Sequence, residues 1–325
     1  MTAITVIGCG VAGLAVAAEL TARGRPLRLL DRQADAGPHQ CSWWAGGMLA
    51  PDCEGDTAEE AVVRLGREAA DWWQAQGAAV TRAGTLVLAP QRDRAEIDRF
   101  ARRVPARSLD GAGIAALEPD LAGRFARGLH VEGEAHLAPR DALAALRRRL
   151  EAAGIHPETG PAPTDGITID CRGLAARDAL PDLRGVRGEM VVLRAPDLNL
   201  TRPVRLLHPR YPLYVVPRGG GVHMLGATQI ESGGRGPATV RAALELLSAA
   251  YALHPAFAEA EILELGADAR PAFPDNLPRI RRRGSTIHVN GLFRHGFLLA
   301  PAMARMVADW LCCGITPEVC DEDNR

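Results

Sequence analysis

The chain has 325 residues, of which 47% are hydrophobic and 24% charged, and its formal net charge at pH 7 is −1. This length predicts two lobes, and this composition is typical of a soluble globular protein. The near-neutral charge gives no reason to expect a nucleic-acid partner or binding to an acidic membrane surface. Every basic residue other than histidine is arginine, which excludes a mechanism through a lysine Schiff base.

The cysteines and histidines indicate a reduced protein without a metal. None of the 7 cysteines forms a C-x-x-C pair, and no basic, cleavable leader precedes the first predicted strand. We therefore expect free thiols and a cytoplasmic location. No apolar run reaches the ~18 residues that a membrane span needs. The 9 histidines lack metal-ligand spacing, and no G-x-S-x-G elbow is present.

The first 31 residues predict a βαβ unit. Residues 4–7 form a β-branched run that predicts a buried strand, and residues 11–22 predict a helix. A second apolar run at 26–30 predicts another strand, which ends before Asp31. An acid at this position after two strands and a helix is typical of a dinucleotide-binding unit.

Three glycines give the first turn of this unit the pattern G-x-G-x-x-G: Gly8, Gly10 and Gly13. The first permits a tight turn, the second lets the backbone approach a pyrophosphate, and the third lets the helix pack on the strand. The pyrophosphate would meet the unpaired N–H groups of the helix, and Asp31 would accept hydrogen bonds from the adenosine ribose. The motif alone leaves NAD and FAD open, and a glycine-rich turn without a ligand is the alternative.

The middle of the chain alternates predicted helices and extended segments. After a loop at 33–56, these are a long amphipathic helix at 57–76, a strand at 85–89, a helix at 93–103, an extended segment at 130–139, a basic helix at 140–153 and a buried strand at 167–171. A Pro- and Gly-rich stretch at 156–166 precedes that strand.

The second half predicts antiparallel strands. They lie at 188–193, 211–217 and 222–227, followed by a helix at 238–250, strands at 261–265 and 286–290, a helix at 302–311 and a frayed acidic tail after 316. We expect an α/β fold with an α+β second lobe. Its Rossmann-like nucleotide-binding lobe (1–80, 136–185 and 270–325) is interrupted by an antiparallel-sheet substrate lobe (81–135 and 186–269).

Four later segments contain residue types of a binding site. They are S-W-W-A-G-G-M-L-A-P at 42–51, L-Y-V-V-P-R-G-G-G-V-H-M-L-G-A-T at 213–228, A-D-A-R-P-A-F-P-D-N-L-P-R-I at 267–280 and N-G-L-F-R-H-G-F-L-L-A-P at 290–301. Together with the opening unit, and in this order, they resemble glycine oxidases of the ThiO type, in the D-amino-acid-oxidase family of flavoproteins. The resemblance covers nearly the whole chain and implies FAD. We expect non-covalent FAD, because Cys312 and Cys313 lie in the last helix, away from the R-P-x-x-P motif.

The resemblance also implies which residues bind FAD. The turn at 8–13 would hold the pyrophosphate, Asp31 and Arg32 the ribose, and the loop after Ser42 would pass along the isoalloxazine ring. A helix N-terminus after the last turn would stabilise negative charge on the reduced ring. The full set is Gly8, Gly10, Val11, Ala12, Gly13, Asp31, Arg32, Ser42, Gly46, Gly47, Met48, Leu292, Phe293, Arg294, His295, Gly296, Phe297 and Leu298.

For the substrate, the resemblance implies a carboxylate site. Arg270 in A-R-P matches the carboxylate-binding arginine, Tyr214 shares the carboxylate, Arg294 is a second pocket arginine and Met48 is a wall of the pocket. A guanidinium can hold a carboxylate by two parallel hydrogen bonds. Each residue has a structural alternative: Arg270 a surface arginine, Arg294 an anchor of its turn, Tyr214 a strand-edge aromatic.

The sequence departs from the family pattern at two positions near the last turn. Leu292 stands where the family often has histidine, and His295 stands where asparagine is common. We expect an oxidase of a small amino acid, glycine first, that uses dioxygen, serves the thiazole branch of thiamine biosynthesis and forms a homo-oligomer, a tetramer by resemblance. Sarcosine, D-amino acids or proline as substrates, a dehydrogenase, and a non-catalytic nucleotide-binding protein remain the alternatives.

Overall fold

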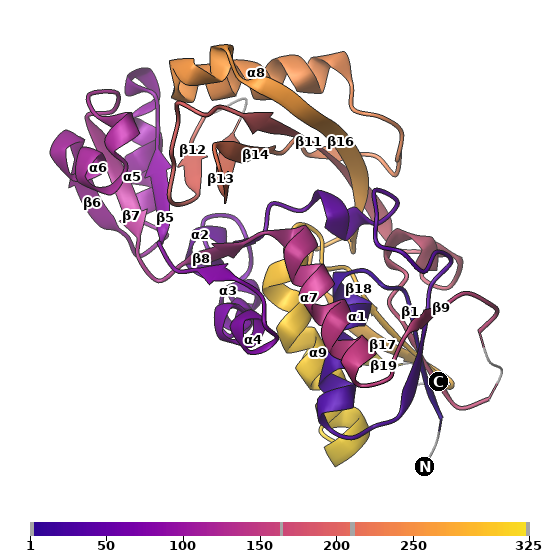
Figure 1. Ribbon diagram of the computed structural model, residues 1–325. Helices are drawn as coiled ribbons and strands as arrows, with labels where there is room; N and C mark the ends of the chain where they lie inside the picture. Colours follow the sequence, from indigo (N-terminus) through magenta and orange to yellow (C-terminus); the bar gives the residue numbers. More distant parts are fainter. Residues whose placement is uncertain (1–2, 163–164, 209–211, 323–325) are drawn as a thin grey trace.

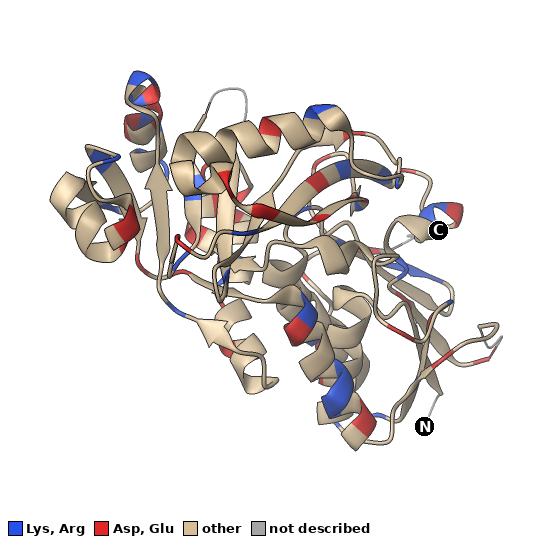
Figure 2. Cartoon of the chain, turned by 45° about the horizontal axis from the view of Figure 1, so that its top comes forward, with Lys and Arg blue, Asp and Glu red and all other residues tan. Residues whose placement is uncertain are grey.

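The computed structural model describes residues 3–162, 165–208 and 212–322. Figure 1 shows two lobes, with the N-terminal and C-terminal segments together in the lower one and a large sheet covered by helix α8 in the upper one. Arginine and acidic residues are interspersed over both lobes (Figure 2). Charge of both signs on the surface agrees with the near-zero net charge.

The lower lobe is built on a seven-stranded sheet in the order β19-β17-β18-β10-β1-β2-β9. β1 is an interior strand and pairs in parallel with both β2 and β10, as a βαβ unit requires. Only the pair β17–β18 is antiparallel. The strands are β1 (Ile4–Ile7), β2 (Leu27–Leu30), β9 (Pro157–Glu158), β10 (Ile167–Asp170), β17 (Arg279–Arg283), β18 (Thr286–Asn290) and β19 (Cys320–Glu322).

Three helices form the core of this lobe: α1 (Val11–Ala22), α7 (Pro139–Ala152) and α9 (Gly296–Cys313). α1 contacts both of the others, and Leu14, Val16 and Leu20 of α1 are fully buried. α9 is long and apolar enough to cross a membrane by length and composition, and 61% of that window is buried inside the protein. A helix that is apolar on most of its surface packs in the core in this way.

The upper lobe is a nine-stranded sheet in the order β15-β11-β14-β13-β12-β5-β7-β6, with β16 also paired to β11. Helix α8 (Val240–Leu253) buries Leu246, Ala250 and Leu253 in the core that it shares with this sheet. The strands are β5 (Thr85–Leu88), β6 (Arg107–Asp110), β7 (Arg127–Val131), β11 (Arg184–Arg194), β12 (Val204–Leu206), β13 (Leu213–Gly219), β14 (Val222–Gly226), β15 (Ile230–Glu231) and β16 (Glu261–Ala272).

A small third sheet lies between the lobes, in the order β3-β8-β4. Its strands are β3 (Met48–Leu49), β4 (Val80–Thr81) and β8 (Ala135–Leu137). The remaining helices are short: α2 (Pro51–Glu54), α3 (Glu60–Gly66), α4 (Ala69–Ala75), α5 (Ala95–Ala101) and α6 (Gly111–Leu117). β3 therefore places the G-G-M-L-A-P segment where the two larger sheets meet.

The helix expected over 57–76 is two helices, α3 and α4. Gly66, the last residue of α3, faces α9 so closely that a Cβ on it would lie 2.7 Å from Leu298 Cγ. The close approach of the two helices requires a glycine there, and a glycine weakens a helix. The prediction of one long helix was therefore wrong at this point.

The last helix begins earlier than expected, at Gly296 instead of residue 302, and it includes Pro301. A proline cannot donate a hydrogen bond to the carbonyl four residues before it, here that of Phe297. The buried indole of Trp73 donates to this carbonyl instead, with Nε1 2.8 Å from the oxygen. A tertiary contact thus satisfies the acceptor that Pro301 leaves open.

Two further strands differ from the prediction. β16 continues to Ala272 because β11 offers it a partner along almost its whole length, so Arg270 lies on a strand. The chain after residue 316 is not simply frayed, since β19 pairs in parallel with β17. β11 begins at Arg184 and β16 ends at Ala272, so both strands cross the lobe boundaries expected at 186 and 269.

The Trp73 contact leads to a stability prediction. We expect Trp73→Ala to lower the free energy of unfolding by ~3–5 kcal/mol, because it opens a cavity in the core and leaves the Phe297 carbonyl unpaired. Urea unfolding followed by circular dichroism measures the change. Trp310→Ala, at a partly buried position of α9, is the control and should cost clearly less. Equal losses for the two variants would contradict this role of Trp73.

Candidate active site

One cavity of about 1140 Å³ lies between the lobes. The residues predicted from the sequence to bind FAD or substrate all line it, except Gly13. Gly13 packs behind the turn, where a Cβ would lie 1.8 Å from the carbonyl oxygen of Gly8. In the described part of the chain, no group of His, Cys, Asp and Glu side chains could hold a metal ion.

The glycine turn forms one end of the cavity. Gly8 has a φ of +103°, and a Cβ there would lie 2.6 Å from the carbonyl oxygen of Cys171. Helix α1 begins after Gly10 with no side-chain cap and no acid in its first turn. Among the described residues, one side chain meets an N–H of its first turn: Ser42 Oγ accepts from the N–H of Val11 at 2.9 Å. This bare helix N-terminus suits the pyrophosphate of a dinucleotide.

Asp31 lies next to this turn because β2 runs parallel to β1. Its carboxylate accepts a hydrogen bond of 2.6 Å from the N–H of Cys9, and it lines the cavity. Arg32 follows it on the exposed side of the wall. The turn and the acid thus form one rigid unit, with the acid placed for a ribose hydroxyl.

The loop at 46–48 forms the wall between the lobes. Gly47 has a φ of +74°, and a Cβ on it would lie 2.2 Å from the carbonyl oxygen of Leu137. The same two residues are joined by the N–H of Leu137, which donates to the Gly47 carbonyl at 2.9 Å. Met48 then pairs with His136 in the small sheet. No residue with a side chain could pass β8 this closely at position 47.

Tyr214 reaches the loop from the upper lobe, on β13. A Cβ on Gly226 would lie 2.5 Å from Tyr214 Oη, and a Cβ on Gly46 would lie 2.9 Å from Tyr214 Cε2. Two glycines therefore leave the space that the ring occupies. Burial raises the pKa of Tyr214, so the hydroxyl stays protonated and can donate a hydrogen bond.

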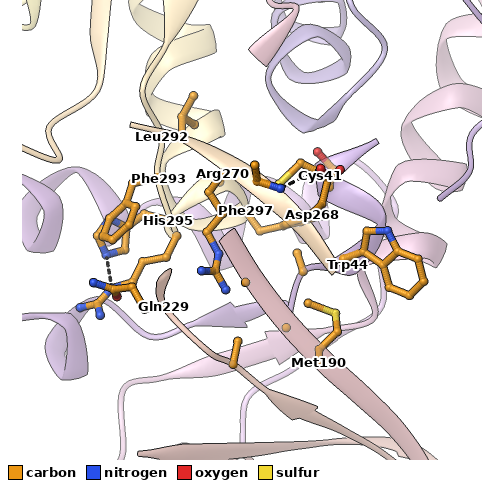
Figure 3. Close-up of a pocket in the computed structure, with 18 of the residues that line it drawn as sticks. Cys41, Trp44, Met190, Gln229, Asp268, Arg270, Leu292, Phe293, His295 and Phe297 are labelled. Carbon is orange, nitrogen blue, oxygen red and sulfur yellow. Dashed lines mark hydrogen bonds between the residues drawn. The ribbon is translucent and has the colours of Figure 1, made fainter. Parts of the chain in front are cut away.

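Arg270 lies on β16 and points into the cavity. Figure 3 shows its guanidinium between Phe293 and His295 on one side and Trp44 and Met190 on the other. The group lies over Gly188, where a Cβ would be 2.1 Å from Arg270 Nη2.

Its hydrogen bond goes to a neutral acceptor, the carbonyl of Thr228, at 3.3 Å. Within the described residues, Arg270 has no carboxylate partner, whereas nearby Arg235 is paired with Asp268. Arg270 is thus a cation on the cavity wall that is available to an anion.

Arg294 is also on the wall, but its guanidinium is occupied. Nη2 lies 2.8 Å from Glu54 Oε2 in an ion pair and donates to Thr57 Oγ1 at 2.6 Å. His295 Nε2 lies 2.9 Å from the same carboxylate oxygen. The His295 ring is buried, and this contact with Glu54 holds it at the start of α9. Within this structure, Arg294 thus anchors its turn to α2.

Glu54 is a residue that the sequence analysis missed. It is 7% exposed, and its second oxygen accepts from Arg205 Nη2 at 2.6 Å. Burial acts to raise its pKa, but Arg205, Arg294 and His295 outweigh that effect and hold the pKa of Glu54 well below its usual range. The residues around it, A-P-D-C-E, do not show which of the two acids is buried. Asp52 stands in the same short helix, but it pairs with exposed Arg67.

The glycine turn, the bare helix N-terminus, Asp31 and the flavin-sized cavity together suit FAD. The DAO family, described as FAD-dependent oxidoreductases, matches residues 3–310. The chain belongs to this family of FAD-dependent oxidoreductases. In such an enzyme FAD supplies the electron acceptor for the oxidation.

The names of individual relatives are consistent with this family. A protein of Rhizobium etli, provisionally named thiamine biosynthesis oxidoreductase ThiO, is 54% identical over 94% of this chain and 95% of its own length. The glycine oxidase of Pseudomonas aeruginosa is 26% identical over 94% of this chain and 93% of its own. The crystal structure of glycine oxidase from Geobacillus kaustophilus has the same fold, with a TM-score of 0.80, 21% identity and coverage of 95% and 94% of the two chains.

The Glu54 cluster leads to a prediction for this FAD-dependent oxidoreductase. We expect Glu54→Gln to lower the free energy of unfolding by ~3–5 kcal/mol at pH 7, because it leaves Arg205 and Arg294 without their carboxylate. The folded pKa of Glu54 lies below the unfolded one. Its contribution is therefore complete above the unfolded value of about 4.3 and is lost as the pH falls through the folded value, so the two proteins converge in acid.

Urea unfolding at pH 7 and at a series of pH values from about 4 downward measures both effects. Glu60→Gln is the control, because Glu60 is exposed and lies 3.6 Å from Arg64; it should change the free energy by less than ~0.5 kcal/mol. An equal loss in the two variants at pH 7 would show that Glu54 is not the centre of a buried charge cluster.

Proposed function

We propose that this FAD-dependent oxidoreductase oxidises a small amino acid, with glycine as its preferred substrate, and transfers the electrons to dioxygen. The observation that carries the proposal is Arg270, a guanidinium on the cavity wall without a carboxylate partner among the described residues. The glycine oxidases among its relatives support the choice of substrate.

Arg270 and Tyr214 would hold the substrate carboxylate. They come from different strands, β16 and β13, and line the same cavity. The guanidinium offers two parallel donors and the hydroxyl a third, which orients the Cα–H bond toward the cofactor. Arg294 and Met48 would complete the pocket. The amine must be neutral for its lone pair to assist the departure of hydride, and solvent can take its proton.

The balanced reaction converts glycine and dioxygen to iminoacetate and hydrogen peroxide. Water then hydrolyses the imine to glyoxylate and ammonia unless another reaction takes it up first. The 54% identity to a protein named for thiamine biosynthesis supports a role in the thiazole branch of that pathway. A cytoplasmic homo-oligomer with non-covalent FAD belongs to the same proposal.

A substrate panel tests the proposal. The purified protein should show a flavin spectrum, release FAD on acid precipitation, and produce one hydrogen peroxide per substrate oxidised in air. We expect the largest kcat/KM for glycine among glycine, sarcosine, D-alanine and D-proline. A larger kcat/KM for another amine would show that this amine, and not glycine, is the preferred substrate. Reduction of a dye without formation of peroxide would identify a dehydrogenase.

Removing the wall cation should impair substrate binding. We expect Arg270→Met to weaken glycine binding by ~2–5 kcal/mol, seen as a KM raised by at least about thirtyfold, because a charged hydrogen-bonded pair is lost. Arg241→Met is the control, since Arg241 lines the same cavity but is largely exposed. Its KM should stay within about twofold of the wild-type value.

Gly188→Ala keeps the guanidinium but occupies the space that it needs. The new Cβ would lie 2.1 Å from Nη2, so the group must move. The KM for glycine should rise in this variant as well, with FAD content unchanged. An unchanged KM in both Arg270→Met and Gly188→Ala would overturn the assignment of the carboxylate site.

A further inference from the structure

Arg218 occupies an unusual place between the lobes. It lies on β13 near the G-G-G turn, outside the cavity wall, and its guanidinium crosses to the lower lobe. Nη2 donates to the carbonyl oxygen of Gly46 at 2.7 Å, and Nη1 donates to that of Leu137 at 3.2 Å. One side chain of the upper lobe thus holds two backbone carbonyls beside the cavity.

These two carbonyls belong to the same local structure. Leu137 also donates its N–H to the carbonyl of Gly47, so the loop at 46–48 is attached to β8 through Leu137. Arg218 is the side chain that joins this assembly to β13. Because Gly46 and Gly47 both line the cavity, movement of this assembly would move the cavity wall.

Tyr214 and Arg218 act on the loop from the same strand. They are four residues apart on β13, whose pairing with β14 is irregular between Pro217 and Gly219, and both side chains reach Gly46. The ring of Tyr214 lies against Gly46, with Cε2 2.9 Å from the position of a Cβ, while Arg218 holds the Gly46 carbonyl. β13 therefore contacts Gly46 at two points.

Arg218 makes these contacts without a counter-ion. Within the described residues, no carboxylate lies within ion-pair distance of it, and its third contact is the sulfur of Met224 at 3.6 Å. Burial lowers the pKa of Arg218 to about 10, so the group is still charged at neutral pH. Hydrogen bonds from a charged donor to carbonyls are stronger than neutral ones.

We propose that Arg218 is a positioning residue for FAD binding: by holding the carbonyls of Gly46 and Leu137 from β13, it fixes the loop at 46–48 on the cavity wall beside Tyr214. The glycine loop has no side chains at 46 and 47 to hold itself in place, and glycine is the residue with the greatest backbone freedom. An external donor therefore restricts Gly46, in addition to the hydrogen bond that Gly47 accepts from Leu137.

Arg218→Met and Arg218→Lys test the proposal. Methionine keeps much of the apolar volume and removes the donors, and lysine keeps the charge but cannot span two carbonyls. We expect apo Arg218→Met to bind FAD about tenfold more weakly than wild type in a fluorescence titration, with Arg218→Lys between the two. Thermal unfolding of the apo proteins, measured separately, reports folding.

A second readout distinguishes positioning from a general loss of structure. Saturating acetate, a carboxylate that cannot be oxidised, should perturb the visible flavin spectrum of the loaded wild type, and the perturbation should be smaller in Arg218→Met. Lysine should restore part of it. Arg124→Met is the matched control. Arg124, like Arg218, donates to a backbone carbonyl, but this carbonyl, that of Leu253, belongs to the same lobe, and Arg124 does not line the cavity.

The FAD titration does not depend on which substrate the enzyme uses. If wild type fails to respond to acetate or glycine, the proposed function fails while the titration still reports on Arg218. FAD affinities equal to wild type in folded Arg218→Met and Arg218→Lys would overturn the inference. If Arg218→Met does not fold, an unchanged affinity and acetate spectrum in Arg218→Lys would overturn it alone.

Discussion

The structure depends on the close contact of the loop at 46–48 with β8 and β13. Gly47 lies so close to Leu137 that no side chain fits at position 47, and the ring of Tyr214 packs against Gly46. The side chains of Tyr214 and Arg218 join this loop to the antiparallel-sheet lobe. Because close-packed contacts tolerate little displacement, the two halves of the cavity keep a fixed relation. The cofactor end and the substrate end therefore form one site.

The distribution of charge then separates groups that hold the structure from a group that is available for binding. Glu54 pairs with Arg205 and Arg294, and Asp268 pairs with Arg235, so these cations on the wall are neutralised by neighbours. Arg270 donates a hydrogen bond to a backbone carbonyl instead. In a cavity that partly excludes water, such a cation attracts an anion more strongly than it would at the surface. The paired residues shape the pocket, and the difference follows from partners that lie far apart in the chain.

Much of the fold could be predicted because its signals are local. The βαβ unit at the N-terminus is confirmed, since a β-branched run, a glycine turn and an apolar helix each specify their own structure. The boundaries that failed depend on tertiary contacts. α9 includes Pro301 because Trp73 supplies the missing donor, and β16 extends because β11 pairs with it. Neither partner can be identified from the neighbouring sequence.

The sequence by itself determined the family and its cofactor, because the glycine turn, Asp31 and four ordered motifs are patterns of residue type and spacing. Nearly all of the site residues that it named line the cavity. Only the tertiary structure decided which partners each of them has there. It showed Arg294 tied to Glu54, Arg270 without a carboxylate among the described residues, and Arg218 holding the loop from the other lobe. The physical reason is that pairing, burial and close approach depend on neighbours in space, which spacing along one chain does not specify.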